Sequence, residues 1–288
     1  MNPQTQFCHN LDCPTRGRLG QGNIRIFSQK QQRYDCKVCG RTFSSTKGTP
    51  FYRLRTAVDL VTLVLTLLVH GCPLQAIVTA FDLDERTVAA WQQRAGSHAQ
   101  RVHEAIVEQG QVDLQHVQAD ELWVKLVSRR VWMAMAMAVP ARLWLGGVIS
   151  PQRDKALISA LVQRVRRSAL STAIVVCVDG LASYASVFPA AFRHAVMTGR
   201  RGRARLVLAA GFQVAQVVKH STQRQVTSVT QRVVQGTLVS TVRMLTATRT
   251  GTMITTAYIE RLNATFRSRL SCLTRYEQPP HSGRLLVF

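Results

Sequence analysis

The sequence predicts an α/β protein whose mixed-sheet core follows two smaller segments. Three observations support this fold class. Runs typical of strands, interrupted by an amphipathic helix, fill much of residues 116–180. Before them, residues 56–95 repeat apolar side chains with a helical period, and four cysteines form two close pairs within residues 8–39. We therefore place domains at residues 1–50, 51–110 and 111–275, followed by an atypical tail at 276–288.

The chain is strongly basic: its 288 residues include 37 Lys and Arg but 15 Asp and Glu, a formal net charge of +22. Such an excess attracts polyanions, so nucleic acid is the first partner to consider and an anionic membrane the second. The longest apolar run, residues 57–69, contains Asp59 and is shorter than the roughly 20 residues of a spanning helix. The first residues do not resemble a secretory signal, and an odd number of cysteines, seven, favours a reducing compartment. We expect a cytoplasmic protein with no membrane partner.

The cysteines near the N-terminus have the spacing of a structural zinc site. Cys8 and Cys13 form one pair, Cys36 and Cys39 form the other, and 22 residues separate the pairs. A strand pair would bring two such knuckles together around one Zn²⁺, and metal binding would supply the folding energy that so short a segment lacks. The alternative is four reduced thiols in a flexible arm. The remaining cysteines are expected to be core thiols: Cys72, Cys177 and Cys272.

The next segment has the pattern of a helix-turn-helix. Apolar residues recur from Leu74 to Phe81 at i, i+3, i+4 and i+7, and Asp84 is placed to cap a second helix. A support helix is predicted at about 56–70. A second helix with long polar side chains on its exposed face is typical of a recognition helix in the major groove, although any helical hairpin shares this period. The candidate DNA-binding residues of this helix are Arg86, Thr87, Gln92, Gln93 and Arg94.

The core reads as three strands, a helix and a fourth strand. The strands are expected in "QHVQADELWVKLV", at 131–139 and at 143–150, the helix in "DKALISALVQRVRR", and the fourth strand in "AIVVCVDG", which ends at Asp179. A further strand is expected in "RLVLAAGF" or "QVAQVVK". This order is that of a ribonuclease H-like sheet, in which acids on the first and fourth strands lie on neighbouring strands.

Few acids remain in this basic chain, and their positions are therefore informative. From residue 155 onward there are 19 Lys or Arg and three acids, Asp179, Glu260 and Glu277. Asp120 and Glu121 are adjacent, and adjacent strand residues point to opposite faces, so we expect that both cannot enter one site. Strand parity alone does not say which of the two is the site residue.

Three motifs together carry a resemblance. "ADELW", "CVDGLASY" and "AYIERLNATFR", in this order behind the cysteine pairs and the helix pair, resemble the bacterial insertion-sequence transposases of the Asp-Asp-Glu (DDE) class, over nearly the whole chain to about Arg275. The resemblance implies an enzyme that binds terminal inverted repeats and catalyses metal-dependent strand cleavage and strand transfer. It assigns the metal-binding triad to Asp120, Asp179 and Glu260. Glu121 would then be the outward-facing neighbour, in a hydrogen bond or ion pair.

The resemblance also implies cofactors and partners. Three converging carboxylates repel one another unless a cation neutralises them, and Mg²⁺ or Mn²⁺ suits oxygen ligands. Two such ions would serve an in-line displacement at phosphorus, first by water and then by the freed 3′-hydroxyl. The partners would be double-stranded DNA at the element ends and the target, and a second copy of the chain in a homodimer or higher oligomer. The protein would be associated with the bacterial nucleoid when bound, and the absence of a G-x-x-x-x-G-K-[ST] loop gives no support to a nucleotide cofactor.

Further basic residues are candidates for phosphate contacts. "TGRRGRAR" at 198–205 concentrates arginines among small residues, as does "RVRR" at 164–167, although a solvated charge run has the same composition. Three cations are candidates for contacts with phosphates near the metals: Lys219, Arg261 and Arg267. The candidate arginines of the first run are Arg200, Arg201, Arg203 and Arg205.

Three alternatives stay open. The first is a non-catalytic DNA-binding regulator, and the second is a recombinase that cuts through Tyr184, Tyr258 or Ser183. The third is an inactive transposase remnant, because the tail "YEQPPHSGRLLVF" departs from the family and suggests a truncation or a shifted reading frame. The inverted-repeat sequence, the target preference and the choice between cut-and-paste and copying are not readable from the sequence.

Overall fold

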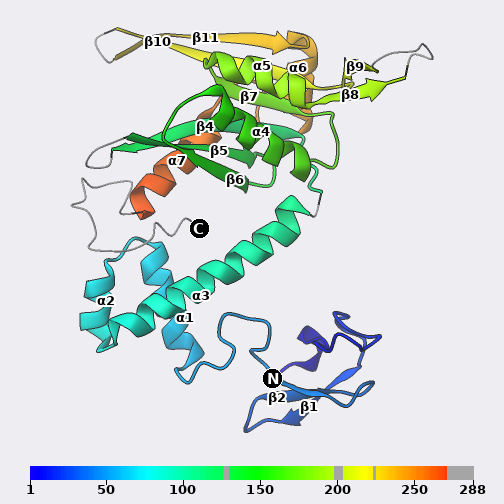
Figure 1. Cartoon of the computed structure of the whole chain (residues 1–288), viewed down its shortest axis with the longest axis vertical. Helices are drawn as coiled ribbons and strands as arrows, with labels where there is room; N and C mark the ends of the chain where they lie inside the picture. The colour runs from blue at the N-terminus through cyan, green and yellow to red at the C-terminus, as the bar shows by residue number, and fades with distance from the viewer. Residues whose placement is uncertain (110, 126–129, 198–203, 223–224, 271–288) are drawn as a thin grey trace. The chain divides into compact units, whose positions relative to one another are not determined.

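The computed structural model describes residues 1–109, 111–125, 130–197, 204–222 and 225–270 (Figure 1). The chain divides into two compact units, Met1–Gln100 and a second that begins at Arg101. The predicted tail at 276–288 lies outside the described residues, as does Cys272. No helix within the described ranges has both the length and the apolar character needed to cross a membrane.

The first unit begins with a 3₁₀ turn, Pro3–Thr5, and a three-stranded antiparallel sheet of β1 (Ile24–Ser28), β2 (Arg33–Cys36) and β3 (Thr42–Ser44) in the order β1-β2-β3. Its small core consists of Ile24, Tyr34 and Phe43 together with the cysteines. Gly40, at φ 68°, makes the tight turn after Cys39, and its N–H donates to the carbonyl of Cys36 at 2.8 Å.

Three helices follow: α1 (Val58–Val69), α2 (Leu74–Phe81) and α3 (Glu85–His103), of which only the last residues, from Arg101 on, belong to the second unit. Ile77, Val88 and Trp91 are buried with residues of α1, so the predicted helix pair and its support helix are confirmed as elements. Asp84 accepts a 2.9 Å hydrogen bond from the backbone N–H of Thr87, as predicted for a cap. Helix α3 continues without interruption beyond Gly96, and a π-helical turn, Glu104–Glu108, follows it.

The second unit is built on a six-stranded mixed sheet with the order β11-β10-β7-β4-β5-β6. The strands are β4 (His116–Lys125), β5 (Arg130–Ala138), β6 (Leu143–Ser150), β7 (Val175–Asp179), β10 (Gln213–Thr222) and β11 (Gln225–Gln235). Strands β4, β7 and β10 are parallel neighbours, while β5, β6 and β11 are added antiparallel. The first and fourth strands of the predicted core are therefore adjacent, as expected.

Both candidate runs for a further strand form strands, but only one joins the sheet. "QVAQVVK" lies in β10, whereas "RLVL" forms β9 (Arg205–Leu208), which pairs with β8 (Arg193–Val196) in a separate two-stranded sheet. Except for the partly buried Leu208, the residues of β8 and β9 are exposed. Strand β11, which pairs along the length of β10, was not predicted.

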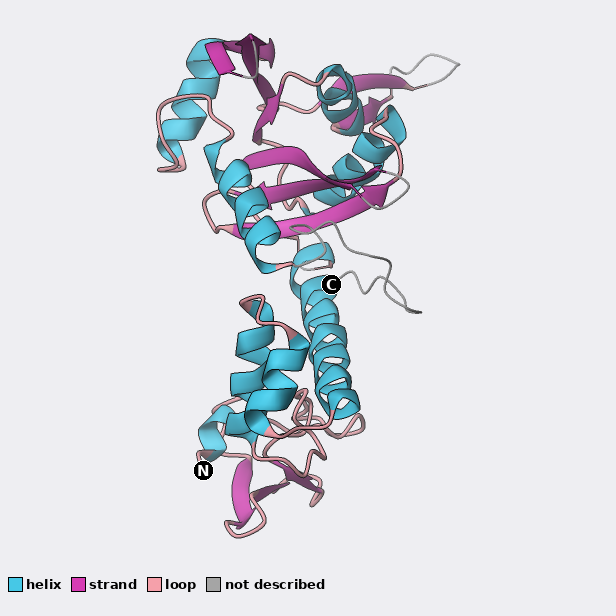
Figure 2. Ribbon diagram, turned by 90° about the vertical axis from the view of Figure 1, so that its left-hand side faces the viewer, coloured by secondary structure: helices cyan, strands magenta, loops and turns pink. Residues whose placement is uncertain are grey.

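Helices pack on both faces of the six-stranded sheet (Figure 2). On one face, α4 (Lys155–Ser168) and α5 (Ala182–Ala191) cover alanines of β4 and β5. On the other, α7 (Ala257–Arg269) covers leucine and methionine side chains of the same strands, and α6 (Leu238–Ala247) covers β7 and β10. The Met-Ala alternation of β5 is thus core packing: its alanines face α4 and its methionines face α7.

Candidate functional site

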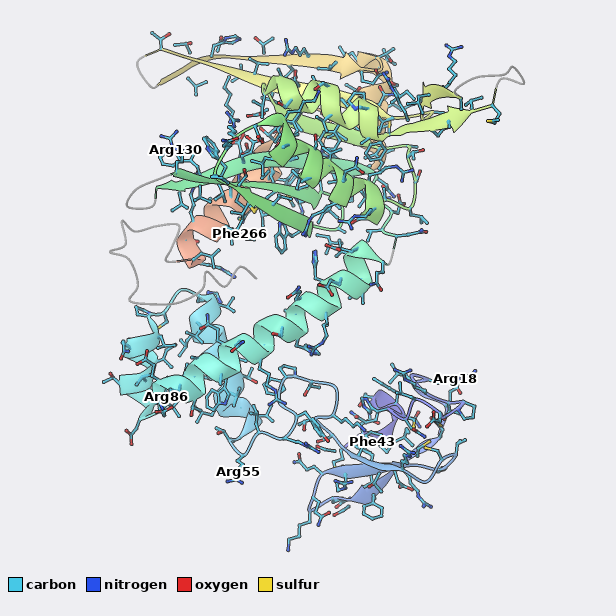
Figure 3. The ribbon with its side chains drawn as sticks, in the orientation of Figure 1. Arg18, Phe43, Arg55, Arg86, Arg130 and Phe266 are labelled. Carbon is cyan, nitrogen blue, oxygen red and sulfur yellow. The ribbon has the colours of Figure 1, made fainter. Side chains whose placement is uncertain are left out.

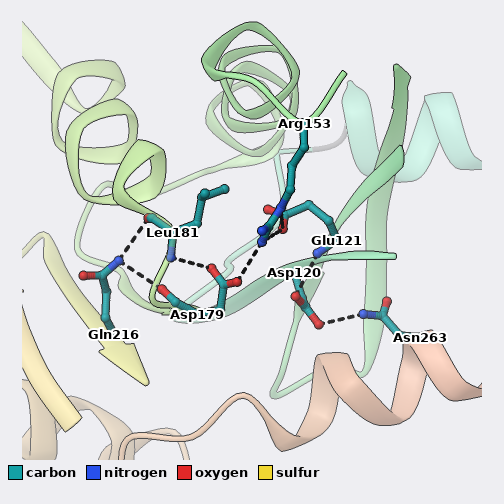
Figure 4. A network of polar contacts seen from close by, with 7 residues as sticks. All are labelled: Asp120, Glu121, Arg153, Asp179, Leu181, Gln216 and Asn263. Carbon is teal, nitrogen blue, oxygen red and sulfur yellow. Dashed lines mark hydrogen bonds and ion pairs between the residues drawn. The ribbon is translucent and has the colours of Figure 1, made fainter. Parts of the chain in front are cut away.

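The acidic residues at the ends of β4 and β7 come together. Ala119 pairs with Val178 in the parallel ladder, so the next residue of each strand, Asp120 and Asp179, follows on the same face of the sheet. Strand β7 ends at Asp179. The carboxylates of Asp120, Glu121 and Asp179 each offer an oxygen, and these oxygens all lie within 4.8 Å of one another (Figure 4).

The structure corrects the prediction for Glu121. Asp120 and Glu121 do leave β4 on opposite faces, because their partners Met135 and Ala134 belong to the α7-facing and α4-facing cores. Both carboxylates nevertheless lie close to that of Asp179. Asp179 is the last residue of β7, so side chains from either face of the sheet can reach it past the end of the strand. Glu121 is also not outward-facing: its side chain is 0% exposed. The predicted ion pair does exist, with Arg153.

Hydrogen bonds orient the two aspartates. Asp120 Oδ1 accepts from the backbone N–H of Glu121 at 2.9 Å, and Oδ2 accepts from Asn263 Nδ2 at 2.8 Å. Asp179 Oδ1 accepts from the backbone N–H of Leu181 at 3.0 Å. Because the donors come from β4, α7 and the turn after β7, the position of each carboxylate depends on the packing of those elements.

The electrostatics of the cluster favour a cation. Burial, followed by the charge of Asp179, raises the pKa of Asp120 to about 7, and burial raises the pKa of Glu121 as well. Glu121 Oε1 is buried next to the Tyr184 hydroxyl, and neither atom completes a hydrogen bond of regular length and angle within the described part of the chain. Carboxylate oxygens that converge with this surplus of negative charge form a donor set suited to a hard divalent cation.

Arg153 is the residue of this cluster that the sequence did not single out. It donates to Glu121 Oε2 at 2.6 Å and to Asp179 Oδ2 at 3.0 Å (Figure 4). It lies in the loop after β6, and no local pattern distinguishes it from the other basic residues of the chain. Asn263, by contrast, had a signal, because it falls at i+3 from Glu260, a spacing that places two residues on one side of a helix.

Glu260 lies on α7 and outside the group of three carboxylates. Its Oε1 accepts from Lys219 Nζ at 2.6 Å and from the Thr256 hydroxyl at 2.6 Å. Burial acts to raise the pKa of Glu260, but these two hydrogen bonds outweigh it, so the pKa is lowered. Its charge still contributes to the raised pKa of Asp120, and Asn263 of the same helix contacts Asp120 directly. Helix α7 therefore presents Glu260 near the cluster, in an ion pair with Lys219.

Gln118 holds the start of this helix. Its Oε1 accepts from the backbone N–H groups of Tyr258 and Ile259, both at 3.0 Å, and its Nε2 donates to the carbonyl of Thr255 at 2.7 Å. Gln118 is buried and lies two residues before Asp120 on the same face of β4. One strand face thus carries both an aspartate of the cluster and the anchor of the helix that bears Glu260.

The four predicted cysteines of the first unit also converge. Their four sulfur atoms all lie within 4.8 Å of one another. The Sγ atoms of Cys8 and Cys39 are 3.6 Å apart, and those of Cys13 and Cys36 are 3.9 Å apart. Sulfurs at the corners of a tetrahedron around Zn²⁺ would be about 3.8 Å apart for a Zn–S bond of about 2.3 Å. Burial raises the pKa of Cys8 to about 12, whereas backbone hydrogen bonds from Cys39 and Val38 outweigh burial and lower the pKa of Cys36 to about 6. The geometry fits a four-cysteine metal site.

The predicted DNA-binding residues differ in exposure and in whether their side chains already bind other residues of the protein. On α3, Arg86 (Figure 3) and Gln93 are exposed and Gln92 is half-buried, while Thr87 donates to the Asp84 cap and Arg94 donates to the carbonyl of Tyr52. In the second unit Arg205 and Arg267 are exposed, and Lys219 pairs with Glu260. Three further candidates lie outside the described residues: Arg200, Arg201 and Arg203.

The tyrosines of the recombinase alternative are poorly placed for nucleophilic attack. Tyr184 is 0% exposed, and burial followed by the charge of Glu121 raises its pKa well above the ordinary value. The ring of Tyr258 lies 3.8 Å from the Arg142 guanidinium carbon, and its hydroxyl donates to the carbonyl of Thr250. Ser183 is half-buried on α5.

Comparison of the chain with protein-family models and with curated proteins finds no match in either case.

Proposed function

We propose that this protein is a DNA transposase of the Asp-Asp-Glu class, which cleaves the ends of an insertion sequence and transfers the freed strand to target DNA. The observation that carries the proposal is the convergence of Asp120 and Asp179 from the ends of two adjacent parallel strands. In this proposal the six-stranded sheet is a ribonuclease H-like catalytic core. The cysteine-bearing sheet is a zinc ribbon, and α2 and α3 form a helix-turn-helix.

Asp120 and Asp179 are the residues that would hold Mg²⁺ or Mn²⁺ in the catalytic core. The bound cations would supply activation of the attacking oxygen and stabilisation of the leaving oxygen in an in-line displacement at phosphorus. The protein orients the ligands: Asn263 and the backbone N–H of Leu181 each bind one carboxylate oxygen. Glu260 would be the third carboxylate, and to join the other two it would have to give up its ion pair with Lys219 in favour of the cation.

The first unit would bind the element ends. Zn²⁺ at the four cysteines would hold the small sheet together, and Arg86 and Gln93 are exposed on α3 for contacts with DNA. The basic excess of the chain favours phosphate binding in both units. Synapsis of two ends would make the active form a homodimer or larger.

The proposal is tested with a supercoiled plasmid that carries the gene and its native flanks. The purified chain is incubated with the plasmid in Mg²⁺ or Mn²⁺, alongside the Asp120→Asn and Asp179→Asn variants. Asp113→Asn is the matched control, because Asp113 is exposed and outside the acidic cluster. Metal-dependent nicks at the flanking ends, present with the control and absent with both cluster variants, are expected. Binding of the flanks with no nick under any condition would contradict the proposed transposase function.

A second candidate, a DNA-binding regulator without catalysis, is favoured by one observation. Glu260 is paired with Lys219 and lies outside the group of three carboxylates, so the described arrangement is not a complete triad. The same assay separates the candidates, because the regulator binds the flanks and leaves the plasmid supercoiled with either metal.

A further inference from the structure

Arg153 occupies a fixed place at the edge of the acidic cluster. It precedes Asp154, whose side chain caps α4 by accepting from the backbone N–H of Leu157 at 2.9 Å. The capped helix anchors the chain on one side of Arg153. On the other side, β6 ends at Ser150, whose hydroxyl accepts from the N–H of Gln152 at 3.1 Å. The backbone that carries Arg153 is therefore held at both ends of a short loop.

The guanidinium group of Arg153 is also held by contacts of its own. Its Nε and Nη2 both donate to Glu121 Oε2, at 3.0 and 2.6 Å, and Nη2 donates in addition to Asp179 Oδ2 at 3.0 Å. Its central carbon lies 5.2 Å from the ring centroid of Trp132. The guanidinium carbon of Arg130 (Figure 3) lies 5.7 Å from the same centroid. A buried carboxylate and an aromatic ring thus restrict an arginine whose side chain remains 33% exposed.

Two carboxylates of the site have a cationic partner, and two are left to bind a cation. Arg153 is anchored by Glu121, whose side chain is fully buried, and Lys219 is bound to Glu260. Two carboxylates, Asp120 and Asp179, are left, and their combined charge is that of one divalent cation with opposite sign. A cation between the aspartates would compete with Arg153 for Asp179 Oδ2, whereas the bonds of Arg153 to Glu121 need not change.

Arg153 also has donor capacity to spare. Nε and Nη2 make all of its hydrogen bonds to the described residues, so Nη1 keeps its donors in a side chain that is partly exposed. A planar guanidinium suits an anion with paired oxygens, above all a phosphate. The fixed position of Arg153 beside two aspartates would place that phosphate at the acidic cluster.

We propose that Arg153 is a phosphate-binding residue for the DNA strand at the acidic cluster. Glu121 and Trp132 hold the guanidinium in place, and it exchanges its hydrogen bond with Asp179 for a phosphate oxygen when the aspartates bind a cation. This inference rests on the function proposed above. It gives the buried Glu121 a role other than metal binding: it anchors Arg153.

The test uses the full-length chain and element-end duplexes in which single phosphates are replaced, one at a time, by uncharged methylphosphonate. Arg153→Gln alone leaves the buried Glu121 without its partner, so the main variant is Arg153→Gln with Glu121→Gln, which removes both charges. Arg243→Gln is the matched control, because Arg243 is exposed on α6 and outside the cluster. Two quantities are measured: the Mn²⁺ affinity without DNA, and the DNA affinity of each duplex in Mn²⁺ at low temperature.

We expect the double variant to bind Mn²⁺ at least as tightly as the wild type and to bind the native duplex about tenfold more weakly, since one charge-assisted contact is lost. Replacing one particular phosphate should weaken wild-type binding by a similar factor and leave the double variant unaffected. Arg243→Gln should keep the wild-type response to that phosphate. A loss in the double variant that is spread over all phosphates would overturn the inference, as would a tenfold loss of Mn²⁺ affinity. A wild-type chain that binds neither Mn²⁺ nor the duplex would instead overturn the proposed function, and this inference with it.

Discussion

The side-chain amide of Asn263 on α7 donates a 2.8 Å hydrogen bond to Asp120 on β4, across 143 residues of sequence. Asn263 is buried and Asp120 is half-buried, and the donor is the amide nitrogen because an ionised carboxylate only accepts. This contact links one aspartate of the cluster to the helix that carries Glu260.

Replacing Asn263 by alanine should loosen α7 from the cluster. A buried hydrogen bond to a charged group contributes about 2 kcal/mol, so Asn263→Ala should lower the free energy of unfolding by about that amount. Urea denaturation measures this loss. Ser268→Ala, on the exposed end of the same helix, should change stability by less than about 0.5 kcal/mol. Equal stability of Asn263→Ala and the wild type would show that the contact does not hold the helix.

The stability of the metal-free cluster should depend on pH in a defined direction. The folded-state pKa of Asp120, about 7, is above the ordinary value of 3.8, so the folded state holds this proton more tightly than the unfolded state. Stability from this group is therefore fully present below about pH 4, and it falls as pH rises to 7, by at most on the order of 4 kcal/mol. Asp120→Asn should lack this loss.

The measurement is urea denaturation of both proteins in Mg²⁺-free buffer between pH 4.5 and 8. Asn at position 120 can still accept from the N–H of Glu121, and the Asn263 amide can rotate so that its unpartnered Oδ1 accepts from the new Nδ2; the main change is then the lost charge. The variant should be the more stable protein at pH 8, and the difference should shrink toward pH 4.5. Parallel curves for the two proteins would show that Asp120 does not titrate in this range.

The four cysteines should bind one zinc ion on which the small sheet depends. Cys36→Ser should lose the metal, measured as zinc content per chain, and should lose the dispersed amide resonances of β1 to β3. Cys72→Ser is the control, since Cys72 packs with the helices of the same unit and not with the other cysteines. Full zinc content in Cys36→Ser would contradict a four-cysteine site.

Arg86 and Arg94 of α3 should differ in their effects on DNA binding. Arg86 is exposed, so Arg86→Ala should weaken binding of the element end and reduce the slope of log affinity against log salt concentration by about 1 if it contacts a phosphate. Arg94 donates to the carbonyl of Tyr52, so Arg94→Ala should also lower the stability of the first unit. Indistinguishable salt slopes for wild type and Arg86→Ala would argue against the phosphate contact.

Much of the fold was predictable because its elements have strong local patterns. The apolar run before Asp179 and the Met-Ala alternation of β5 predicted strands, and both strands bury the residues that the patterns implied. Strand β11 was not predicted because its residues are mostly exposed, so its sequence lacks the apolar alternation of a half-buried strand. Its strand conformation depends instead on hydrogen bonding to β10. Helix α5 was missed as well, and Pro189 within it is an unfavourable local signal.

The candidate site was predictable only in part. Asp120 and Asp179 end up together because parallel pairing of their strands follows from the order of elements. The approach of Glu121 depends on where β7 stops, and the pairing of Glu260 with Lys219 depends on where β10 and α7 meet, neither of which a local pattern encodes. Arg153 comes from a loop, and its partners are fixed by tertiary packing alone.

Calorimetric titration of the zinc-loaded, full-length protein with Mn²⁺ tests whether Asp120 and Asp179 hold a divalent cation. Mn²⁺ prefers oxygen ligands, so the cysteine site should not interfere. We predict saturable binding to the wild type and to Asp113→Asn, with affinity reduced at least tenfold in Asp120→Asn and in Asp179→Asn. Binding that is unchanged in both cluster variants, or absent from the wild type, would contradict a cation site at the two aspartates.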